Sequence, residues 1–351
     1  MDNGVNMQTL LKISNISKEY EKVVALDNVS LEIEKGTVFG LLGPNGAGKT
    51  SLIRILTGIT LPDKGSFSLN ETGHHDFNQI SRMIGYLPEE RGLYPDMKVI
   101  DQLEFFGRIK GLSKKETHQK IDFYCKKLEI DGWLGKKARE LSKGMQQLVQ
   151  FVACIFYEPS LIILDEPFTG LDPINSLKLQ NEILELKNEG KTIIFSTHRM
   201  EQVEEFCQNI ALINKGNIIL EGNLQEIKNR FKENIYEIKY IGECGLETCE
   251  DYEVISPSWE LGDRRSELNT PLSTLYSPLR AGGTIRIKDL NHHSSANILL
   301  KKILQQIEVV SFTEVLPSLS EIFIESVSAL DMHFCTKKLH NDEKEVLNEQ
   351  D

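Results

Sequence analysis

The chain has 351 residues, 40% of them hydrophobic and 26% charged, which suits a soluble globular protein with room for a catalytic domain and a smaller second domain. Its formal net charge of −12 argues against a general nucleic-acid binder, because phosphate contacts need a basic face. No uninterrupted apolar run reaches the roughly 18 residues that span a bilayer, and the N-terminus lacks the features of a secretory signal. We therefore expect a cytoplasmic protein whose six scattered cysteines are reduced thiols.

The first two thirds of the chain alternate between strand and helix patterns, which predicts an α/β fold with a parallel sheet. An inserted segment at 97–155 turns helical and polar, as expected of an α-helical subdomain. We expect an N-terminal antiparallel β subdomain beside the α/β core. The predicted elements are strands within 10–42, a strand at 37–42, a helix from 49 to about 57, strands at 161–164 and 193–195, and a helix at 175–188.

The character of the sequence changes after about Arg230, and we predict a small α+β accessory domain over 231–330 that follows a catalytic domain over 1–230. Its expected elements are strands at 235–241, 284–287 and 309–312, a helix at 295–307 and a last helix from Ser320, in a βαβ-like arrangement. Residues 256–283 form either a long loop or a partly disordered insertion. The acidic end, 331–351, is predicted to be a disordered tail.

A phosphate-binding loop is the strongest local signal. Residues 43–50 read GPNGAGKT and fit the pattern G-x-x-x-x-G-K-[ST], with a strand before them and a helix after them. Glycines let the backbone curl so that its N–H groups face phosphate oxygens, and the helix N-terminus adds positive potential. Lys49 would neutralise the β- and γ-phosphates, and the Thr50 hydroxyl would ligate Mg²⁺. The predicted nucleotide contacts are Gly43, Asn45, Gly46, Gly48, Lys49, Thr50 and Ser51.

Two acidic residues end the apolar strand at 161–164. Catalytic groups collect at the carboxyl ends of parallel strands, so Asp165 is predicted to hold the Mg²⁺ and Glu166 to act as general base on the attacking water. An Asp-Glu pair after apolar residues is a weak signal by itself and gains weight because it follows a P-loop. The cofactors expected are therefore ATP and Mg²⁺.

Residues 141–147, LSKGMQQ, resemble the signature sequence of ABC ATPases, which commonly reads LSGGQ. Ser142 and Gly144 are retained, whereas Lys143 and Met145 depart from the pattern. The resemblance implies that this loop, at a helix N-terminus, binds the γ-phosphate of ATP held by a second subunit. Without that resemblance, Ser142 would be read as a plain helix N-cap.

Further segments follow the family order, and the resemblance implies their roles. Asp172 would lie in the D-loop and meet the partner subunit, and His198 would contact the γ-phosphate together with Glu166. Tyr20 would stack on adenine; an exposed tyrosine is the alternative. Glu89 stands where the family usually has a glutamine that touches the metal and the attacking water. Its carboxylate can still ligate Mg²⁺, so Glu89 is predicted as a metal ligand with Thr50 and Asp165, and it adds charge near the phosphates.

Residues 87–94, LPEERGLY, are similar to a subgroup of sodium-efflux and drug-efflux ABC ATPases, and 316–323 resemble the closing helix of that subgroup's extra C-terminal domain. This resemblance implies an ATP-hydrolysing subunit that forms a homodimer or a heterodimer. The dimer would lie on the cytoplasmic face of the membrane and drive export through a separate membrane permease. One alternative is a soluble ABC ATPase that acts on ribosomes or DNA, although those types usually carry two such domains or a long coiled coil. A second alternative is a regulator that binds nucleotide without hydrolysing it. The presence of Glu166 and His198 argues against that alternative.

Overall fold

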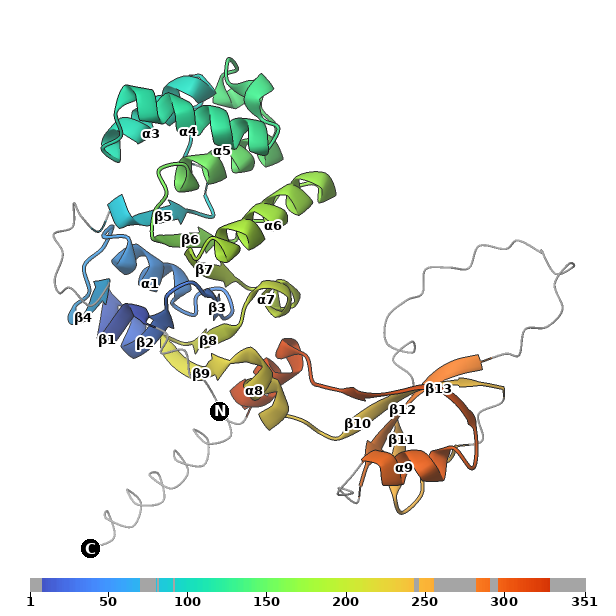
Figure 1. Cartoon of the computed structure of the whole chain (residues 1–351). Coiled ribbons are helices and arrows are strands. Elements are labelled where there is room, and N and C mark those ends of the chain that lie inside the picture. The colour runs from blue at the N-terminus through green and yellow to red at the C-terminus, as the bar shows by residue number, and fades with distance from the viewer. Residues whose placement is uncertain are drawn as a thin grey trace, which may run out of the picture. The chain divides into compact units, whose positions relative to one another are not determined.

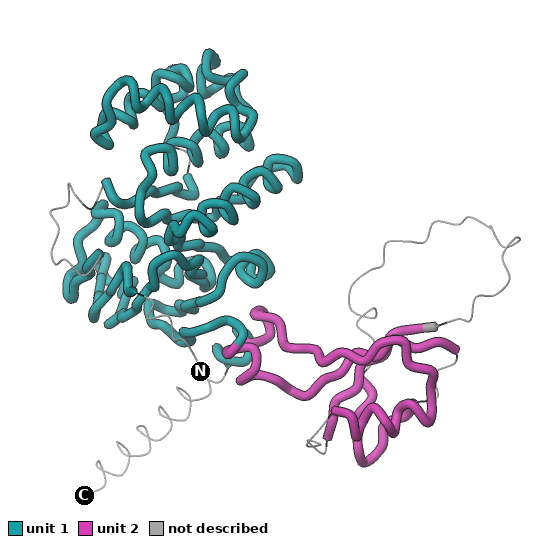
Figure 2. The backbone as a smooth tube through the Cα atoms, viewed as in Figure 1, with its two compact units in different colours: residues 1–225, 323–351 teal, residues 226–322 magenta. Residues whose placement is uncertain are grey.

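The computed structural model describes residues 8–69, 80, 82–90, 92–242, 246–255, 282–290 and 296–328. The chain divides into two compact units, residues 1–225 with 323–351 and residues 226–322 (Figure 2). Residues 256–281 and the tail at 331–351, for which we predicted a loop or insertion and disorder, lie outside the described residues.

A six-stranded sheet organises the first unit (Figure 1). Five strands run parallel and the last is antiparallel. Every residue of β3, β6 and β7 is buried, as expected of parallel strands that are covered on both faces. The spatial order is β5 (Ile84–Leu87), β6 (Leu161–Asp165), β7 (Thr192–Thr197), β3 (Val38–Leu42), β8 (Asn209–Asn214) and β9 (Asn217–Asn223).

An antiparallel sheet of three strands, in the order β2 (Val23–Glu34), β1 (Thr9–Tyr20), β4 (Lys64–Leu69), forms the predicted N-terminal β subdomain. Its alternating apolar residues, such as Ile13 and Leu31, share one buried cluster with α1 (Lys49–Leu56) and with the central strands. The helix that follows the P-loop is therefore held between the two sheets.

Helices account for the inserted segment, which confirms the predicted helical subdomain. Ser113 opens α4 with a complete capping box, in which its hydroxyl accepts from the Glu116 N–H and the Glu116 carboxylate accepts from the Ser113 N–H. The elements of this subdomain are α3 (Val99–Ile109), α4 (Lys114–Lys127), the 3₁₀ turns η1 (Asp131–Trp133) and η2 (Ala138–Glu140), and α5 (Lys143–Ile155). Two further helices of the unit are α6 (Pro173–Asn188) and α7 (Met200–Phe206).

The second unit contains a four-stranded antiparallel sheet in the order β11-β12-β10-β13. The crossover from β12 through α9 to β13 passes over β10, so the predicted βαβ piece is a split βαβ unit. Its elements are β10 (Ile235–Ile241), β11 (Tyr252–Ile255), β12 (Gly282–Asp289), α9 (Ala296–Ile303) and β13 (Glu308–Val315). A helix, α8 (Leu224–Arg230), precedes the sheet, and the last helix covers residues 319–328.

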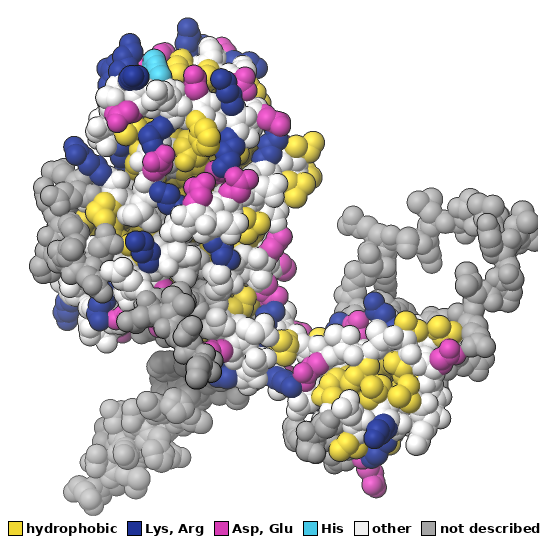
Figure 3. Space-filling view, viewed as in Figure 1, with side chains coloured by type: hydrophobic (Ala, Val, Ile, Leu, Met, Phe, Trp, Pro, Cys, Tyr) yellow, Lys and Arg dark blue, Asp and Glu magenta, His cyan; other side chains and the backbone are white. Residues whose placement is uncertain are grey.

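In the part of the chain that the structure describes, no helix combines the length and the apolar character that crossing a bilayer requires. The cysteines described there, Cys125, Cys154, Cys207 and Cys249, are free thiols. On the face of the first unit drawn in Figure 3, lysines and arginines alternate with acidic side chains.

We predict that Gly85→Ala destabilises the first unit. A Cβ at Gly85, on β5, would lie 2.4 Å from the backbone oxygen of Cys154 on α5, so the helix must move away from the strand. Overpacking of this kind costs about 1–3 kcal/mol of unfolding free energy. Denaturant unfolding of the full chain measures the loss. Gly132→Ala is the matched control, because a Cβ there meets open space; equal stability of the two variants would contradict the prediction.

Candidate functional site

A cavity of about 360 Å³ opens where the P-loop meets the end of β6. It collects most of the residues that the sequence predicted for nucleotide and metal binding, although these come from separate parts of the chain. The lining residues are Val23, Ala25, Asn45, Gly46, Ala47, Gly48, Lys49, Thr50, Ser51, Glu89, Asp165 and Glu166.

The P-loop backbone requires glycine at two positions. A Cβ at Gly43 would lie 2.1 Å from the Ile213 oxygen, and one at Gly48 would lie 2.4 Å from the Ala25 oxygen. Both residues also have positive φ angles, of 147° and 116°. Gly48 is the N-cap of α1 and offers no side chain to the first turn of the helix. The N–H groups of that turn are therefore available to an anion.

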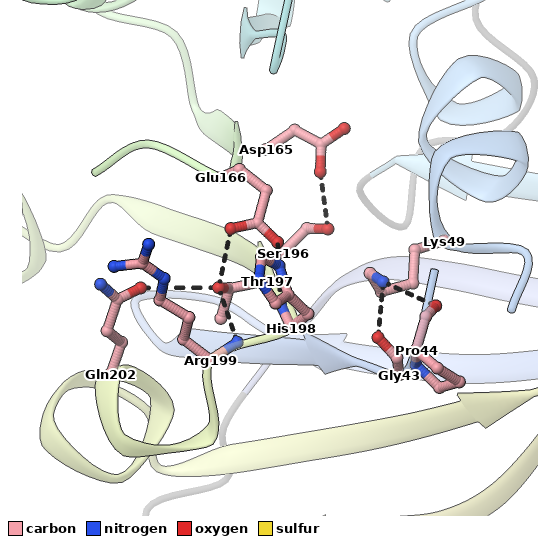
Figure 4. A network of polar contacts seen from close by, with 10 residues as sticks. All are labelled: Gly43, Pro44, Lys49, Asp165, Glu166, Ser196, Thr197, His198, Arg199 and Gln202. Atoms are coloured by element: carbon pink, nitrogen blue, oxygen red, sulfur yellow. Dashed lines mark hydrogen bonds and ion pairs between the residues drawn. The ribbon is translucent and has the colours of Figure 1, made fainter. Parts of the chain in front are cut away.

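The Lys49 ammonium group is buried and donates to two carbonyl oxygens of its own loop, at 2.6 Å to Gly43 and 3.1 Å to Pro44 (Figure 4). Desolvation lowers the pKa of Lys49, while the negative charges of Glu166, Asp165 and Glu89 act in the opposite direction. A phosphate group in the cavity would give this cation a charged partner in place of neutral carbonyls.

Asp165 ends β6 beside Ser196, the residue opposite it on β7, and its Oδ1 accepts from the Ser196 hydroxyl at 2.8 Å. Burial raises the pKa of Asp165, and the charges of Glu89 and Glu166 act in the same direction. Mg²⁺ typically takes one or two carboxylates together with phosphate oxygens and water. The Asp165 carboxylate and the Thr50 hydroxyl, both at the cavity, fit that donor set.

Glu166 is held by the last residue of β7, Thr197, and by His198, which follows it. Its Oε2 accepts from the Thr197 hydroxyl at 3.0 Å, and its Oε1 accepts from the His198 N–H at 2.8 Å and lies 2.6 Å from His198 Nδ1. Glu166 itself has a φ of 48°, in the left-handed region. The structure therefore joins Glu166 and His198, the two residues predicted to act together on the γ-phosphate and water.

Three other predicted residues lie outside this cavity. Ser142 is exposed at the N-cap of α5, where its hydroxyl accepts from the Met145 N–H at 3.2 Å. Gly144, two residues further, approaches the D-loop so closely that a Cβ there would lie 3.3 Å from the Gly170 oxygen. Asp172 caps α6 and accepts from the Asn175 N–H at 3.0 Å. The Asp172 residue is exposed, and the hydrogen bond from the Asn175 N–H lowers the pKa of its carboxylate.

Tyr20 also does not line the cavity. It is 38% exposed and pairs across β1 and β2 with Val23, which does line it. Stacking of Tyr20 on adenine stays a prediction. Sequence reasoning missed Val23 and Ala25, whose small apolar side chains carry no chemical signal.

Sequence reasoning also did not assign Ser196 and Thr197 as site residues. Both are completely buried and each hydroxyl contacts one of the two acids. The available signal was their position at the end of an apolar strand, directly before His198.

A larger cleft of about 650 Å³ adjoins the nucleotide cavity, with Thr50, Glu89 and Asp165 lining both. Its far walls come from α3 and α5, through residues such as Phe106 and Ala153. Among its polar groups, Gln150 is 7% exposed and its Oε1 has no hydrogen-bond partner among the described residues. Burial lowers the pKa of Lys110, whose ammonium group lies 4.6 Å from the Tyr157 ring centroid.

Comparisons with known proteins agree with this geometry. The family model of the ABC transporter matches residues 26–169, and that of the ATP-binding protein DrrA1-3-like C-terminal domain matches residues 222–327. The chain is 39% identical to the uncharacterized ABC transporter ATP-binding protein YhaQ of Bacillus subtilis over 297 residues, which is 84% of this chain and 98% of YhaQ.

Two other likenesses concern the first unit. The Nod factor export ATP-binding protein I of Cupriavidus metallidurans is 36% identical over 222 residues, covering 63% of this chain and 73% of that protein. The dimeric structure of MJ0796, a bacterial ABC transporter cassette, superposes with a TM-score of 0.56 at 26% identity and covers 61% of this chain and 99% of the cassette. The P-loop, the pair of acids at the end of β6 and the likeness to these relatives all agree. The chain therefore belongs to the ABC transporter ATP-binding proteins, the ATPase subunits of ABC transporters.

Proposed function

We propose that two copies of this chain bind two MgATP molecules between them and hydrolyse them to drive a separate membrane permease. One observation carries the proposal. Lys49, Asp165 and Glu166 line a single cavity, whereas Ser142 is exposed on a helix N-terminus outside it. Since one chain carries both halves of a site that it does not assemble by itself, a second copy can supply the missing half. The dimeric MJ0796 cassette supports this reading.

In this proposal Lys49 and the P-loop N–H groups hold the β- and γ-phosphates, and Ser142 with Gly144 of the other copy contacts the γ-phosphate. Thr50 and Asp165 hold Mg²⁺, which supplies charge neutralisation at the phosphates, and Glu89 faces the same space. Glu166 takes the proton of the attacking water, and His198 bridges from Glu166 to the γ-phosphate. Asp172 lies at the contact between the copies. Loss of the γ-phosphate contact then lets the copies separate.

Export is the direction of transport we infer, and the likeness to the Nod factor export ATP-binding protein I supports it. The cleft next to Glu89 is our proposed contact for the permease, because its walls join the helical subdomain to the nucleotide cavity. The chain then acts on the cytoplasmic face of a membrane. We propose residues 1–230 as the ATPase domain and 231–330 as an accessory domain.

Glu166→Gln is predicted to trap the dimer. The amide cannot take a proton from water, so kcat falls by at least about 100-fold while MgATP still binds. Size-exclusion chromatography with light scattering should find the variant dimeric with MgATP and monomeric without nucleotide. A monomer at saturating MgATP, or turnover like that of the unmodified chain, would refute the proposal. Glu189→Gln, at the C-cap of α6, is the matched control.

A mixing experiment tests the shared site. Lys49→Ala removes the ammonium group that neutralises the phosphates, and Ser142→Arg blocks the signature loop. Each variant alone should therefore hydrolyse almost no ATP. A mixed dimer regains one intact site, formed by the P-loop of one copy and the signature loop of the other. Random pairing makes half of the dimers mixed with one of two sites intact, so turnover should recover to about a quarter of the unmodified level. No recovery in confirmed mixed dimers would mean that each site lies within one copy.

Ala153→Trp is predicted to fill the cleft and release the chain from membranes. The indole would occupy space at the far wall of the cleft, next to Phe106 and Gln150. MgATP binding by the purified chain should remain. The fraction of the chain that sediments with membranes and co-purifies with an integral membrane protein should fall at least about tenfold, because the contacts at the centre of an interface contribute most of the binding energy. Lys115→Trp, on the exposed side of α4, is the control. Unchanged membrane binding of Ala153→Trp would exclude this cleft as the contact.

A further inference from the structure

Two consecutive hydroxyl side chains end β7, next to Asp165, the last residue of β6, and Glu166, which follows it (Figure 4). Asp165 and Ser196 are direct neighbours in the parallel register, and the Glu166 N–H donates to the Ser196 backbone oxygen at 2.9 Å. Each hydroxyl reaches one carboxylate, at 2.8 Å for Ser196 and 3.0 Å for Thr197. Each of the two carboxylates thus accepts a hydrogen bond from a different hydroxyl group at the end of β7.

The single proton of the Thr197 hydroxyl has a defined acceptor. The Arg199 N–H donates to Thr197 Oγ1 at 3.1 Å, so one lone pair of the oxygen is already used. Two acceptors remain for the proton, namely Glu166 Oε2 at 3.0 Å and Gln202 Oε1 at 3.5 Å. The carboxylate is nearer and charged, so it receives the proton. Thr197 is completely buried, so bulk water does not compete.

The two oxygens of Glu166 are held in different ways. Oε1 contacts His198, through the backbone N–H and the ring. Oε2 contacts the Thr197 hydroxyl, whose stiff, β-branched side chain belongs to a buried strand. The His198 ring is about half exposed and can turn toward a phosphate. When it turns, Oε1 becomes available to a water, and Oε2 keeps its partner.

We propose that Thr197 is a positioning residue for the general base: its hydroxyl anchors Oε2 of Glu166 so that Oε1 faces the attacking water after His198 turns to the nucleotide. This inference rests on the role of Glu166 proposed above. A base displaced by as little as 1 Å loses up to about 100-fold in rate, so an anchor on the second oxygen matters for kcat. Thr197 touches neither water nor nucleotide, and binding of MgATP does not depend on it.

The experiment compares Thr197→Val, Thr197→Ser and Thr192→Val in the full-length chain. Valine keeps the shape and removes the donor, so kcat should fall at least about tenfold with KM for MgATP unchanged. Serine keeps the donor and should restore kcat to within about threefold. Thr192→Val is the matched control, because Thr192 is a buried threonine at the opposite end of β7 whose hydroxyl accepts from the Gly36 N–H at 2.8 Å. It should lower stability without lowering kcat.

Each other outcome overturns the inference. Full kcat in Thr197→Val, a raised KM with kcat preserved, or a serine variant as slow as valine would each exclude an anchoring hydroxyl. If the valine variant does not fold, Thr197→Ser and Thr197→Ala replace it, since both lack the methyl group and only serine donates; equal kcat values would again refute the idea. Glu166→Gln distinguishes failure of this inference from failure of the proposed function. Full activity of Glu166→Gln would refute the proposed function. An inactive Glu166→Gln together with a fully active Thr197→Val would refute only the anchoring role of Thr197.

Discussion

The in-register pairing of three parallel strands determines where the chemistry of this protein lies. β3 leads directly into the P-loop, β6 ends at Asp165 just before Glu166, and β7 ends in two hydroxyl residues just before His198. β7 pairs with both of the other strands, so the three carboxyl ends lie at one edge of the sheet. A shift of one residue between β6 and β7 would take Asp165 away from Ser196 and turn the side chains of the shifted strand to the other face of the sheet.

The electrostatics of the site follow from that placement. One buried ammonium group faces three carboxylates, those of Asp165, Glu166 and Glu89. The field is therefore negative before any phosphate enters, and burial with this excess charge raises the pKa of Asp165. A triphosphate would add further negative charge, so we expect tight binding to need a divalent cation. We expect Glu89, in place of the family's usual glutamine, to strengthen that dependence.

Sequence reasoning reached those parts whose signal is local. The P-loop pattern, the apolar runs of β3, β6 and β7 and the periodicity of the helical subdomain each lie within a short window, and the structure has them where they were predicted. The hairpin of β8 and β9 was missed because β9 is partly exposed throughout and lacks a clear alternation. β11, with four residues, is too short to stand out.

Long-range register was not accessible to sequence reasoning either. Nothing local indicates that β10 lies between β12 and β13, which turns a βαβ piece into a split one. The same limit explains Ser196 and Thr197, because their role depends on the neighbouring strand and not on their own segment. Val23 and Ala25 reach the cavity because the antiparallel sheet packs beside the P-loop, which is again a tertiary fact.

The close approach of Gly144 to Gly170 has a mechanical consequence. The first turn of the signature helix packs against residues 170–171, where a Cβ at Gly144 would lie 3.3 Å from the Gly170 oxygen and 3.5 Å from Leu171 Cδ2. Because protein interiors are close-packed, a displacement of one segment is passed to the other. In the proposed dimer, the signature loop and the D-loop of one copy would therefore move together where they meet the other copy.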